Sequence, residues 1–197
     1  MGGKSSKKKG KRPGLLSVLT IGNSMAGKTA LIQRYANNFF EQEALTTIAN
    51  DFVLVNKVFK CKDEEVKVKV KIWDSPGQER FESIVVSALK NTQGILLVYD
   101  TTERKSFNDL QTWINRINSC NKAESFPFIL IANKIDLKEK RAVTENECKA
   151  FADNLKIPYF ETSAKTGQGV TEAFNSLFEK VFSTQLNDDS EHFTIKQ

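Results

Sequence analysis

The chain has 197 residues, of which 40% are hydrophobic, and this suits one globular domain with a substantial core. No run approaches the ~18 apolar residues that a membrane-spanning helix needs, and no apolar stretch follows the basic start as a secretory signal requires. The three cysteines are few and widely spaced, which argues against a disulfide framework or a zinc site, so we expect reduced, intracellular thiols.

The net charge of +5 is concentrated in the first twelve residues. They contain no acid and six basic residues, which are Lys4, Lys7, Lys8, Lys9, Lys11 and Arg12. Removing these six from the 29 basic residues leaves 23, against 24 acidic residues, so the rest of the chain is nearly neutral. A basic body would favour nucleic acid as a partner, whereas a basic arm on a neutral body indicates a tethering or targeting element.

The apolar pattern predicts strands and helices in alternation. Short apolar runs are typical of buried strands, and alternating residues around a charged turn indicate a hairpin. In chain order, the predicted elements are strand 15–21, helix 28–37, hairpin strands 52–60 and 66–73, strand 94–99, helix 106–118, strand 128–132, helix 144–154 with Thr144 and Glu147 as a capping box, and helix 170–182.

This alternation predicts an α/β fold, with a six-stranded, mainly parallel sheet and helices on both faces. We expect residues 1–14, which are rich in Gly, Lys and Ser, to form a disordered arm, and residues 15–183 to form a single domain. After Phe182 the chain becomes polar, so residues 184–197 are expected to fray as a short tail.

A phosphate-binding motif follows the first predicted strand. Residues 22–29, Gly-Asn-Ser-Met-Ala-Gly-Lys-Thr, match G-x-x-x-x-G-K-[ST] in the strand–loop–helix context that this motif requires. Its backbone N–H groups can converge on phosphates at a helix N-terminus, while Lys28 adds a charge and Thr29 offers a hydroxyl to Mg²⁺. The expected contact residues are Ser24, Met25, Ala26, Gly27, Lys28 and Thr29. By itself the motif leaves ATP and GTP open, and an ordinary turn with an incidental lysine is the alternative.

A second motif, Asp-Ser-Pro-Gly-Gln at residues 74–78, follows the hairpin. Asp74 at a strand end near a phosphate loop can hold Mg²⁺ through water, and Gly77 can bring its N–H close to a terminal phosphate. Gln78 can orient the attacking water, which makes it the candidate catalytic residue. In isolation D-x-x-G is also compatible with a solvated turn, but one hairpin after a phosphate loop it indicates nucleotide hydrolysis.

A third motif, Asn-Lys-Ile-Asp at residues 133–136, follows the predicted strand 128–132. The Asp136 carboxylate can accept both N1–H and the 2-amino group of guanine, and adenine has no such donor pair, so the site would reject ATP. The Lys134 stem can cover the base, and a backbone N–H from residues 163–165 can reach guanine O6. The candidate residues are Asn133, Lys134, Asp136, Ser163, Ala164 and Lys165. Alone, the motif could be a helix-capping loop; after two phosphate motifs it indicates guanine.

Together these residues resemble the Ras superfamily of small GTPases, and the Rab branch most closely, from about residue 15 to 182. Residues 73–81, Trp-Asp-Ser-Pro-Gly-Gln-Glu-Arg-Phe, look like the Rab stretch W-D-T-A-G-Q-E-R-F, and residues 98–102 and 161–165 also match. The resemblance implies a single P-loop G domain that binds GTP/GDP with Mg²⁺. It also implies a slow GTPase, producing GDP and phosphate, that works as a switch in vesicle trafficking.

The resemblance assigns further residues to the nucleotide and the metal. Thr47 would join Thr29 and Asp74 at Mg²⁺ when GTP is bound, and Phe40 would pack against the guanine. Additional nucleotide contacts are implied for Ala30 and Leu137. Two switch segments, at 41–52 and 75–90, would be ordered by the terminal phosphate and relax after hydrolysis.

Several positions depart from the Rab pattern. Rabs usually have glycine where this chain has Ala49 and alanine where it has Pro76, and Met25 is bulky for the phosphate loop. Proline fixes φ and removes an N–H, so we expect slower or altered switching. A hydrolysis-impaired GTP-binding scaffold is therefore the main alternative. An ATP-using P-loop kinase or ATPase is a second one, which the guanine motif opposes.

The resemblance implies exchange factors, GTPase-activating proteins and effectors as partners of the switch segments. Rab effectors usually meet a phenylalanine, a tryptophan and a tyrosine. Phe52 and Trp73 match the first two, but the tyrosine position is Ala88, so no particular effector is implied. We expect a monomer that does not bind nucleic acid.

The N-terminus offers a membrane anchor. Most Rabs end in prenylated cysteines, whereas the last cysteine here is Cys148, so we expect no prenyl anchor. Met-Gly-Gly-Lys-Ser-Ser fits M-G-x-x-x-[ST], which predicts myristoylation of Gly2, with the basic arm as the second signal. The protein would then be cytoplasmic and peripheral on the cytosolic face of an intracellular membrane. A solvated, nuclear or RNA-contacting lysine-rich tail is the alternative.

Overall fold

The computed structural model describes residues 14–41, 47, 51–61, 64–77, 87–119, 127–186 and 194–196. Gly2, the six basic residues of the arm, Ala49 and Gln78 lie outside the described residues, as do parts of both predicted switch segments and of the predicted tail. Within the described part of the chain, no helix is long and apolar enough to span a bilayer.

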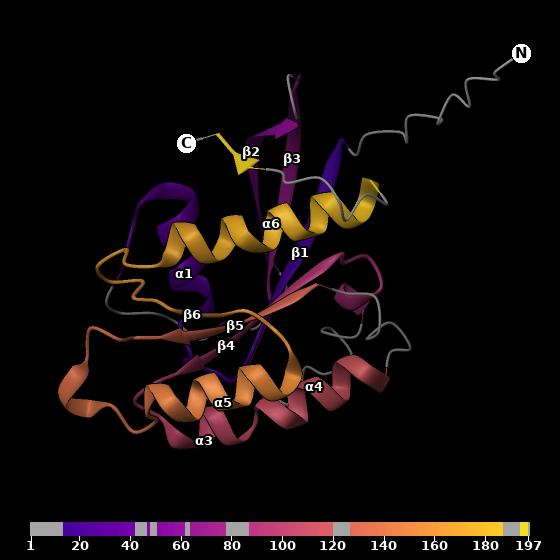
Figure 1. Ribbon diagram of the computed structural model, residues 1–197. Helices are drawn as coiled ribbons and strands as arrows, with labels where there is room; N and C mark the ends of the chain where they lie inside the picture. Colours follow the sequence, from indigo (N-terminus) through magenta and orange to yellow (C-terminus); the bar gives the residue numbers. More distant parts are fainter. Residues whose placement is uncertain are drawn as a thin grey trace, which may run out of the picture.

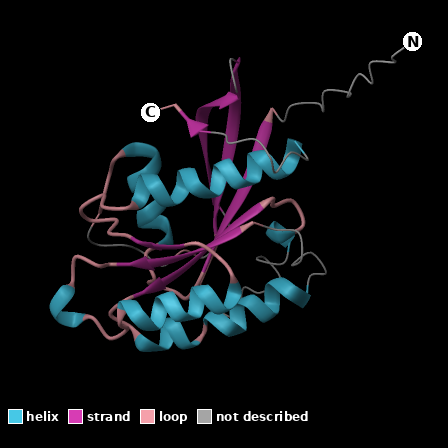
Figure 2. Cartoon of the chain, in the orientation of Figure 1, coloured by secondary structure: helices cyan, strands magenta, loops and turns pink. Residues whose placement is uncertain are grey.

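A central sheet carries the fold (Figures 1 and 2). Its strands are β1 (Leu15–Ile21), β2 (Asp51–Cys61), β3 (Glu64–Asp74), β4 (Gly94–Asp100), β5 (Phe128–Asn133), β6 (Tyr159–Glu161) and β7 (Thr194–Ile195). The main helices are α1 (Lys28–Asn37), α3 (Arg104–Asn108), α4 (Leu110–Ser119), the 3₁₀ turn η3 (Lys138–Lys140), α5 (Glu145–Leu155) and α6 (Val170–Leu186).

The strand order is β6-β5-β4-β1-β3-β2-β7. Strand β1 pairs in parallel with β3 and β4, and β4, β5 and β6 continue the parallel pairing, whereas β2 is antiparallel to β3. The predicted α/β fold with a mainly parallel sheet is therefore confirmed. The carboxyl ends of β1, β3, β4 and β5 meet at one edge, which brings the loops that follow them together.

The predicted number of six strands is wrong, because a seventh strand lies in the tail expected to fray. Strand β7 pairs antiparallel with β2, placing Ile195 opposite Phe59. Ile195 is 8% exposed and joins the core, and its N–H donates to Glu179 at 2.9 Å. Ile195 is thus buried beside β2 although the surrounding tail is polar. The composition of the tail alone does not predict this burial.

The predicted helix at 106–118 is also corrected. The structure has two helices there, α3 and α4, with Asp109 between them. The Glu103 side chain accepts from the Lys105 N–H and starts α3 two residues earlier than expected. By contrast, the capping box of α5 is confirmed, because Thr144 and Glu147 exchange bonds between side chain and backbone.

Helices cover both faces of the sheet, as predicted (Figure 1). Helices α1 and α6 pack on one face, where Phe59 stacks on Phe182 with ring centroids 4.2 Å apart. Helices α3, α4 and α5 cover the other face, where Trp113 and Tyr99 are buried. Two buried apolar layers therefore hold the sheet edge that carries the candidate site.

Candidate functional site

The loop between β1 and α1 has a backbone that only certain residues can adopt. Gly27 has a φ of 89°, and a Cβ placed there would collide with the Asn133 amide. At Gly22 a Cβ would collide with the Val98 carbonyl of β4. Met25 has a φ of 64°, a conformation that costs a non-glycine residue free energy, and its side chain is 58% exposed. The phosphate-binding motif therefore packs closely against β4 and Asn133, and Met25 within it has a strained backbone.

Lys28 is oriented by the same loop. Its Nζ donates to the carbonyl oxygens of Gly22 at 2.9 Å and Asn23 at 2.8 Å, and the residue is only 5% exposed. Burial lowers the pKa of Lys28 to about 8, although the charge of Asp74 acts in the opposite direction. A buried ammonium held in place in this way is suited to an anionic ligand.

Oxygen atoms from three separate segments meet next to Lys28. Thr29 Oγ1 donates to Asp74 Oδ2 at 2.6 Å and lies 2.9 Å from Thr47 Oγ1. Asp74 is 7% exposed, and burial raises the pKa of its carboxyl, against the lowering effect of the Thr29 hydrogen bond. Its Oδ1 is buried with no hydrogen-bond partner among the described residues. One orphaned carboxylate oxygen beside two hydroxyls fits Mg²⁺, which prefers oxygen ligands.

The segment after β3 is anchored to the sheet and to the phosphate loop. Ser75 Oγ donates to the Thr20 carbonyl of β1 at 2.5 Å, and Pro76 is buried. The Gly77 carbonyl accepts from the Ser24 N–H at 2.9 Å, and a Cβ at Gly77 would collide with the loop backbone. The chain up to residue 77 is therefore held against the loop, immediately before Gln78, which lies outside the described residues.

A cavity of about 180 Å³ lies on the α1 side of the phosphate loop, and its lining is mostly apolar. Nine of the residues assigned to the nucleotide from sequence line it: Gly27, Ala30, Phe40, Asn133, Lys134, Asp136, Leu137, Ala164 and Lys165. These residues come from four segments of the chain, 27–30, 40, 133–137 and 164–165. The structure thus brings the predicted guanine-reading residues to one enclosed space beside the phosphate loop.

Asn133 connects the walls of this guanine cavity. It is 1% exposed, its Nδ2 donates to the Ala26 carbonyl at 2.9 Å, and its Oδ1 accepts from the Ala164 N–H at 3.3 Å. Asp136 Oδ1 accepts from Ser163 Oγ at 2.6 Å. Lys134, with a φ of 67°, forms an ion pair with Asp100 at 2.6 Å. These bonds fix the phosphate loop, the third motif and residues 163–165 relative to one another.

Arg34 of α1, a residue without a predicted role, binds the loop that lines the same cavity. Its Nε donates to the Ala164 carbonyl at 2.7 Å and one terminal nitrogen to the Lys165 carbonyl at 2.8 Å. Its other terminal nitrogen donates to the backbone and side chain of Asn38 at 3.0 and 2.9 Å. An arginine within an amphipathic helix carries no sequence signal of this role, because its partners are backbone carbonyls more than a hundred residues away.

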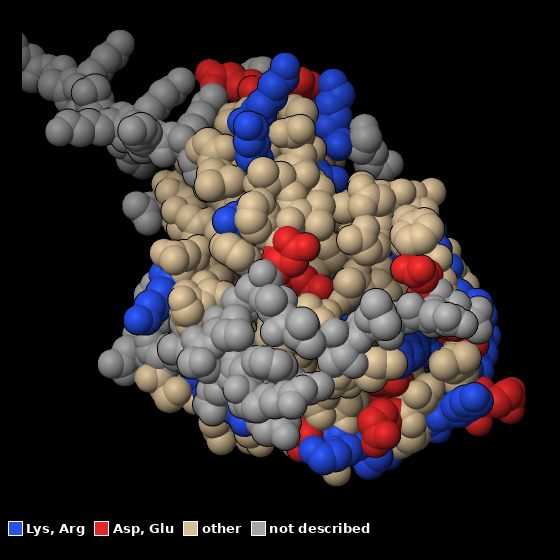
Figure 3. Space-filling view, turned by 180° about the vertical axis from the view of Figure 1, so that it is seen from behind, with Lys and Arg blue, Asp and Glu red and all other residues tan. Residues whose placement is uncertain are grey.

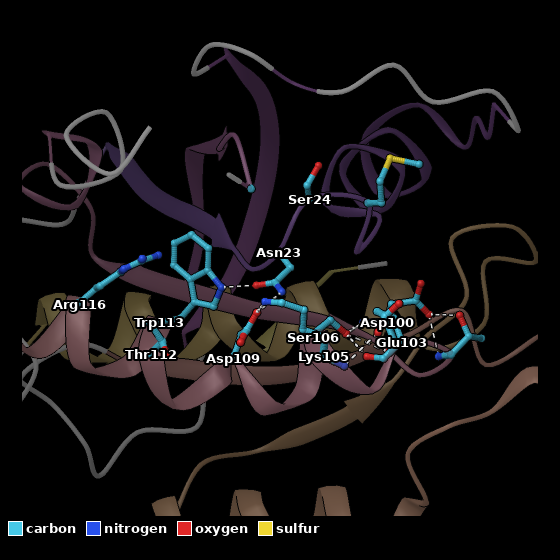
Figure 4. A pocket seen from close by; sticks show the side chains of 13 residues that line it. Asn23, Ser24, Asp100, Glu103, Lys105, Ser106, Asp109, Thr112, Trp113 and Arg116 are labelled. Atoms are coloured by element: carbon cyan, nitrogen blue, oxygen red, sulfur yellow. Dashed lines mark hydrogen bonds and ion pairs between the residues drawn. The ribbon is translucent and has the colours of Figure 1, made fainter. Parts of the chain in front are cut away.

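A larger cavity of about 600 Å³ lies on the other side of the phosphate loop, next to α3 and α4 (Figure 4). Asn23 projects from the loop toward this wall. Its Oδ1 accepts from Trp113 Nε1 at 2.8 Å, and its Nδ2 donates to Asp109 Oδ2 at 2.7 Å. Ser24, Met25 and Gly77 also line the cavity. The sequence analysis gave Asn23 no role, yet its side chain ties the loop to α4.

The matched effector positions lie on neighbouring strands. Phe52 and Trp73 are opposite each other in the β2–β3 pairing, with ring centroids 5.2 Å apart. Ala88 is 7% exposed, so the position that usually carries a tyrosine is buried here. The two aromatic rings are therefore present without the third member of the usual surface.

The chain is similar in sequence to known proteins of the Ras family. The Ras family model matches residues 17–183. The chain is 35% identical to Ras-related protein Rab-27B of Homo sapiens, over 85% of this chain and 79% of that protein. It is 39% identical to Rab-13 of Mesocricetus auratus (83% and 78%) and 35% identical to GTP-binding protein ypt2 of Schizosaccharomyces pombe (90% and 86%). The chain therefore belongs to the Ras family, as a Rab-like small GTPase that hydrolyses GTP.

Proposed function

We propose that this GTPase acts as a molecular switch in vesicle or membrane trafficking. The observation that supports this most directly is the adjacency of the guanine cavity, the buried Lys28 and the Thr29–Asp74–Thr47 oxygen cluster on one sheet edge. A nucleotide can be held there by its base and by its phosphates at once. The trafficking role is extended from the Rab-named relatives.

Each part of the site has a separate task in this proposal. Asp136 accepts the guanine donors, and Lys28 neutralises phosphate charge at the helix N-terminus. Thr29, Thr47 and Asp74 would hold Mg²⁺, directly or through water, and the ion would supply positive charge against the developing charge of the phosphates. Gln78 orients the attacking water. The phosphate contacts assigned to Ser24, Met25, Ala26 and Gly77 belong to the same proposal.

Single-turnover hydrolysis of GTP tests the catalytic assignment. We expect slow hydrolysis that requires Mg²⁺, is lost in excess chelator and is strongly reduced in Gln78→Leu, with nucleotide binding retained. Thr166→Ala, a substitution outside the assigned contacts, is the matched control. A wild-type rate no better than buffer would instead favour the GTP-binding scaffold.

The anchored segment at 75–77 gives the scaffold alternative a specific basis. Buried Pro76 lies between Ser75, bonded to β1, and Gly77, bonded to the phosphate loop. A switch that must move here has to break these contacts, so we expect slow exchange between states. Pro76→Ala should accelerate nucleotide release or GTP hydrolysis; equal rates in the two proteins would remove proline as the cause.

The partner surfaces are proposed at 41–52 and 75–90, where exchange factors, GTPase-activating proteins and effectors would read the nucleotide state. Phe52 and Trp73 provide an aromatic contact at the border of both segments. We propose a monomer without nucleic-acid binding, because the basic excess is confined to the arm at residues 1–12. Sedimentation of the GDP- and GTP-bound forms would check the monomer.

For membrane attachment we propose myristoylation of Gly2, with the six basic residues of the arm as the second signal on the cytosolic face of an intracellular membrane. Intact-mass measurement after co-expression with an N-myristoyltransferase tests the modification. We expect added acyl mass in the wild type and none in Gly2→Ala. Unmodified wild-type protein would refute the anchor without affecting the GTPase assignment.

A further inference from the structure

At the Leu15 end of β1, the face of β1, β3 and β2 that lies opposite α6 has no covering helix among the described residues, whereas Leu19 and Ile21 further along β1 are buried in the second core. Residues of β3 alternate strictly: Val66, Val68 and Val70 are buried toward α6, whereas Lys67 and Lys69 are exposed on the opposite side. Because successive side chains of a strand point to opposite faces, the lysines share one face. That face lies away from α6, on the side of the molecule shown in Figure 3.

The strand register shows which side chains surround the lysines. Lys69 lies opposite Leu15 of β1, and Lys71 lies opposite Leu54 of β2. Leu15 is 51% exposed and Leu54 is 53% exposed, so both present apolar surface beside the lysines. We define the open sheet face by five residues, Leu15, Leu54, Lys67, Lys69 and Lys71. It combines apolar side chains with a line of positive charges along β3.

The charge of this face is only weakly compensated. Among the described residues, neither Lys67 nor Lys69 has a carboxylate within ion-pair distance, and the Lys71 ammonium lies 3.8 Å from the ring centres of both Phe52 and Trp73. Glu65 lies on the same face two residues before Lys67, and the hydrogen bond from Lys196 at 3.0 Å, together with a smaller effect of the Lys67 charge, lowers the pKa of its carboxyl. Figure 3 shows positive side chains at the β2–β3 end of this side of the molecule, with acidic side chains beside them at its tip.

The basic arm joins the body at the same place. Gly14 accepts a hydrogen bond from the Lys69 N–H at 3.1 Å, and Leu15, the next residue, opens β1. The arm that carries the six basic residues of positions 4–12 therefore joins the described chain at Gly14, next to Lys69. Any surface that holds the arm is brought to the open sheet face by this connection.

We propose that the open sheet face is a second contact with an anionic lipid bilayer, and this rests on the proposed attachment through the arm. Lysine side chains can extend their charged ends to lipid phosphates while exposed leucines reach the interface. Lysines near an anionic leaflet strengthen membrane binding, so Lys67 and Lys69 would add to the marginal affinity of a single acyl chain. An acidic protein could bind this face without any contribution from the arm. We favour the bilayer because the arm, which is proposed to bind the membrane, joins the domain next to these lysines.

Flotation of the full-length myristoylated protein with vesicles tests this contact. The vesicles are phosphatidylcholine with or without phosphatidylserine, and the variant is Lys67→Glu/Lys69→Glu. Lys138→Glu/Lys140→Glu on η3, also exposed, makes the same charge change elsewhere and is the matched control. We expect the sheet variant to bind serine-containing vesicles at least about tenfold more weakly than the control, and that difference to shrink in high salt.

Equal binding by the sheet variant and the control would overturn the proposal, and so would an equal loss on pure phosphatidylcholine vesicles. Leu15→Ser/Leu54→Ser should also weaken binding, but without salt dependence. GTP hydrolysis and thermal unfolding show that each variant is folded. Gly2→Ala separates the two proposals: loss of binding only in Gly2→Ala supports the anchor alone, and loss only in the lysine variant supports the sheet face alone.

Discussion

The guanine end and the phosphate end of the site differ in how far the protein itself satisfies their polar groups. At the guanine end, Asn133, Asp136 and Lys134 each have a bonded partner within the fold, and Arg34 supports the loop behind them. At the phosphate end, Lys28 donates to two backbone carbonyls but carries a charge that burial opposes, and one buried oxygen of Asp74 has no partner among the described residues.

We infer from this difference that base recognition would be preorganised in the folded chain, whereas the phosphate end would be completed by its ligand. A preorganised base pocket binds without the entropic cost of ordering its side chains. The polar groups of the phosphate end gain their missing partners from phosphate and metal ion, so nucleotide should stabilise this end most. Five predictions test the contrast, from the largest expected effect to the smallest.

The guanine end should depend most strongly on one carboxylate. Asp136→Ala removes the acceptor for both guanine donors, so we expect the preference for GTP over ATP to fall by ~10⁴-fold. Competition of each nucleotide against a fluorescent GDP analogue measures the preference. Ser163→Ala removes only the 2.6 Å bond to Asp136 and should cost much less. An unchanged preference in Asp136→Ala would place base recognition elsewhere.

The phosphate end should show a pH dependence that the guanine end lacks. Free protein loses the Lys28 proton as pH rises through about 8, and phosphate binding needs the charged form, so GDP affinity should fall by up to about tenfold per pH unit above this value. Titration of a fluorescent GDP analogue from neutral to alkaline pH measures it. Lys28→Arg keeps its charge and should lose the dependence.

The same group affects the stability of the nucleotide-free protein with the opposite sign. Because the folded-state pKa of Lys28 is lowered from 10.5 to about 8, the unfolded chain holds this proton more tightly between these values. The free energy of unfolding should therefore gain a favourable contribution as pH rises from about 8 toward 10.5. Urea titrations of wild type and Lys28→Met across this window measure the contribution, and parallel curves would contradict it.

Support from α1 should be measurable without any change at the base itself. Arg34→Met breaks the two bonds to the carbonyls of Ala164 and Lys165, so we expect GDP to dissociate about thirtyfold faster, since each lost bond costs ~1 kcal/mol. Arg34→Lys should restore only part of the effect. Arg104→Met, which breaks a pairing with Glu147 away from the cavity, should leave the rate unchanged.

The smallest effect is expected at the strained residue of the phosphate loop. Met25→Gly relieves the positive φ, so we expect it to raise the free energy of unfolding by ~1 kcal/mol and to change nucleotide release. Lys156→Gly, at a φ of 54° after α5, should stabilise similarly and leave nucleotide release unchanged. If both variants behave alike in nucleotide release, the strain at Met25 has no functional role.

Much of the fold could be read from local patterns. The bounds of β1 and α1, and the capping box at Thr144, agree with the predictions because hydrophobic spacing and capping chemistry act over a few residues. Strand β6 was not located, because three residues carry no periodicity. Strand β7 was missed because its burial depends on Phe59, more than a hundred residues away.

The amino-acid sequence by itself determined the chemistry of this protein: the phosphate loop, the metal segment and the guanine motif each need particular residue types at short spacing. The tertiary structure decided the rest, because the parallel sheet brings distant strand ends to one edge. Only there do Asp74 and Thr47 meet Thr29, and only there does Arg34 reach residues 164 and 165. The open sheet face likewise exists only once three strands pair and place Lys69 beside Gly14.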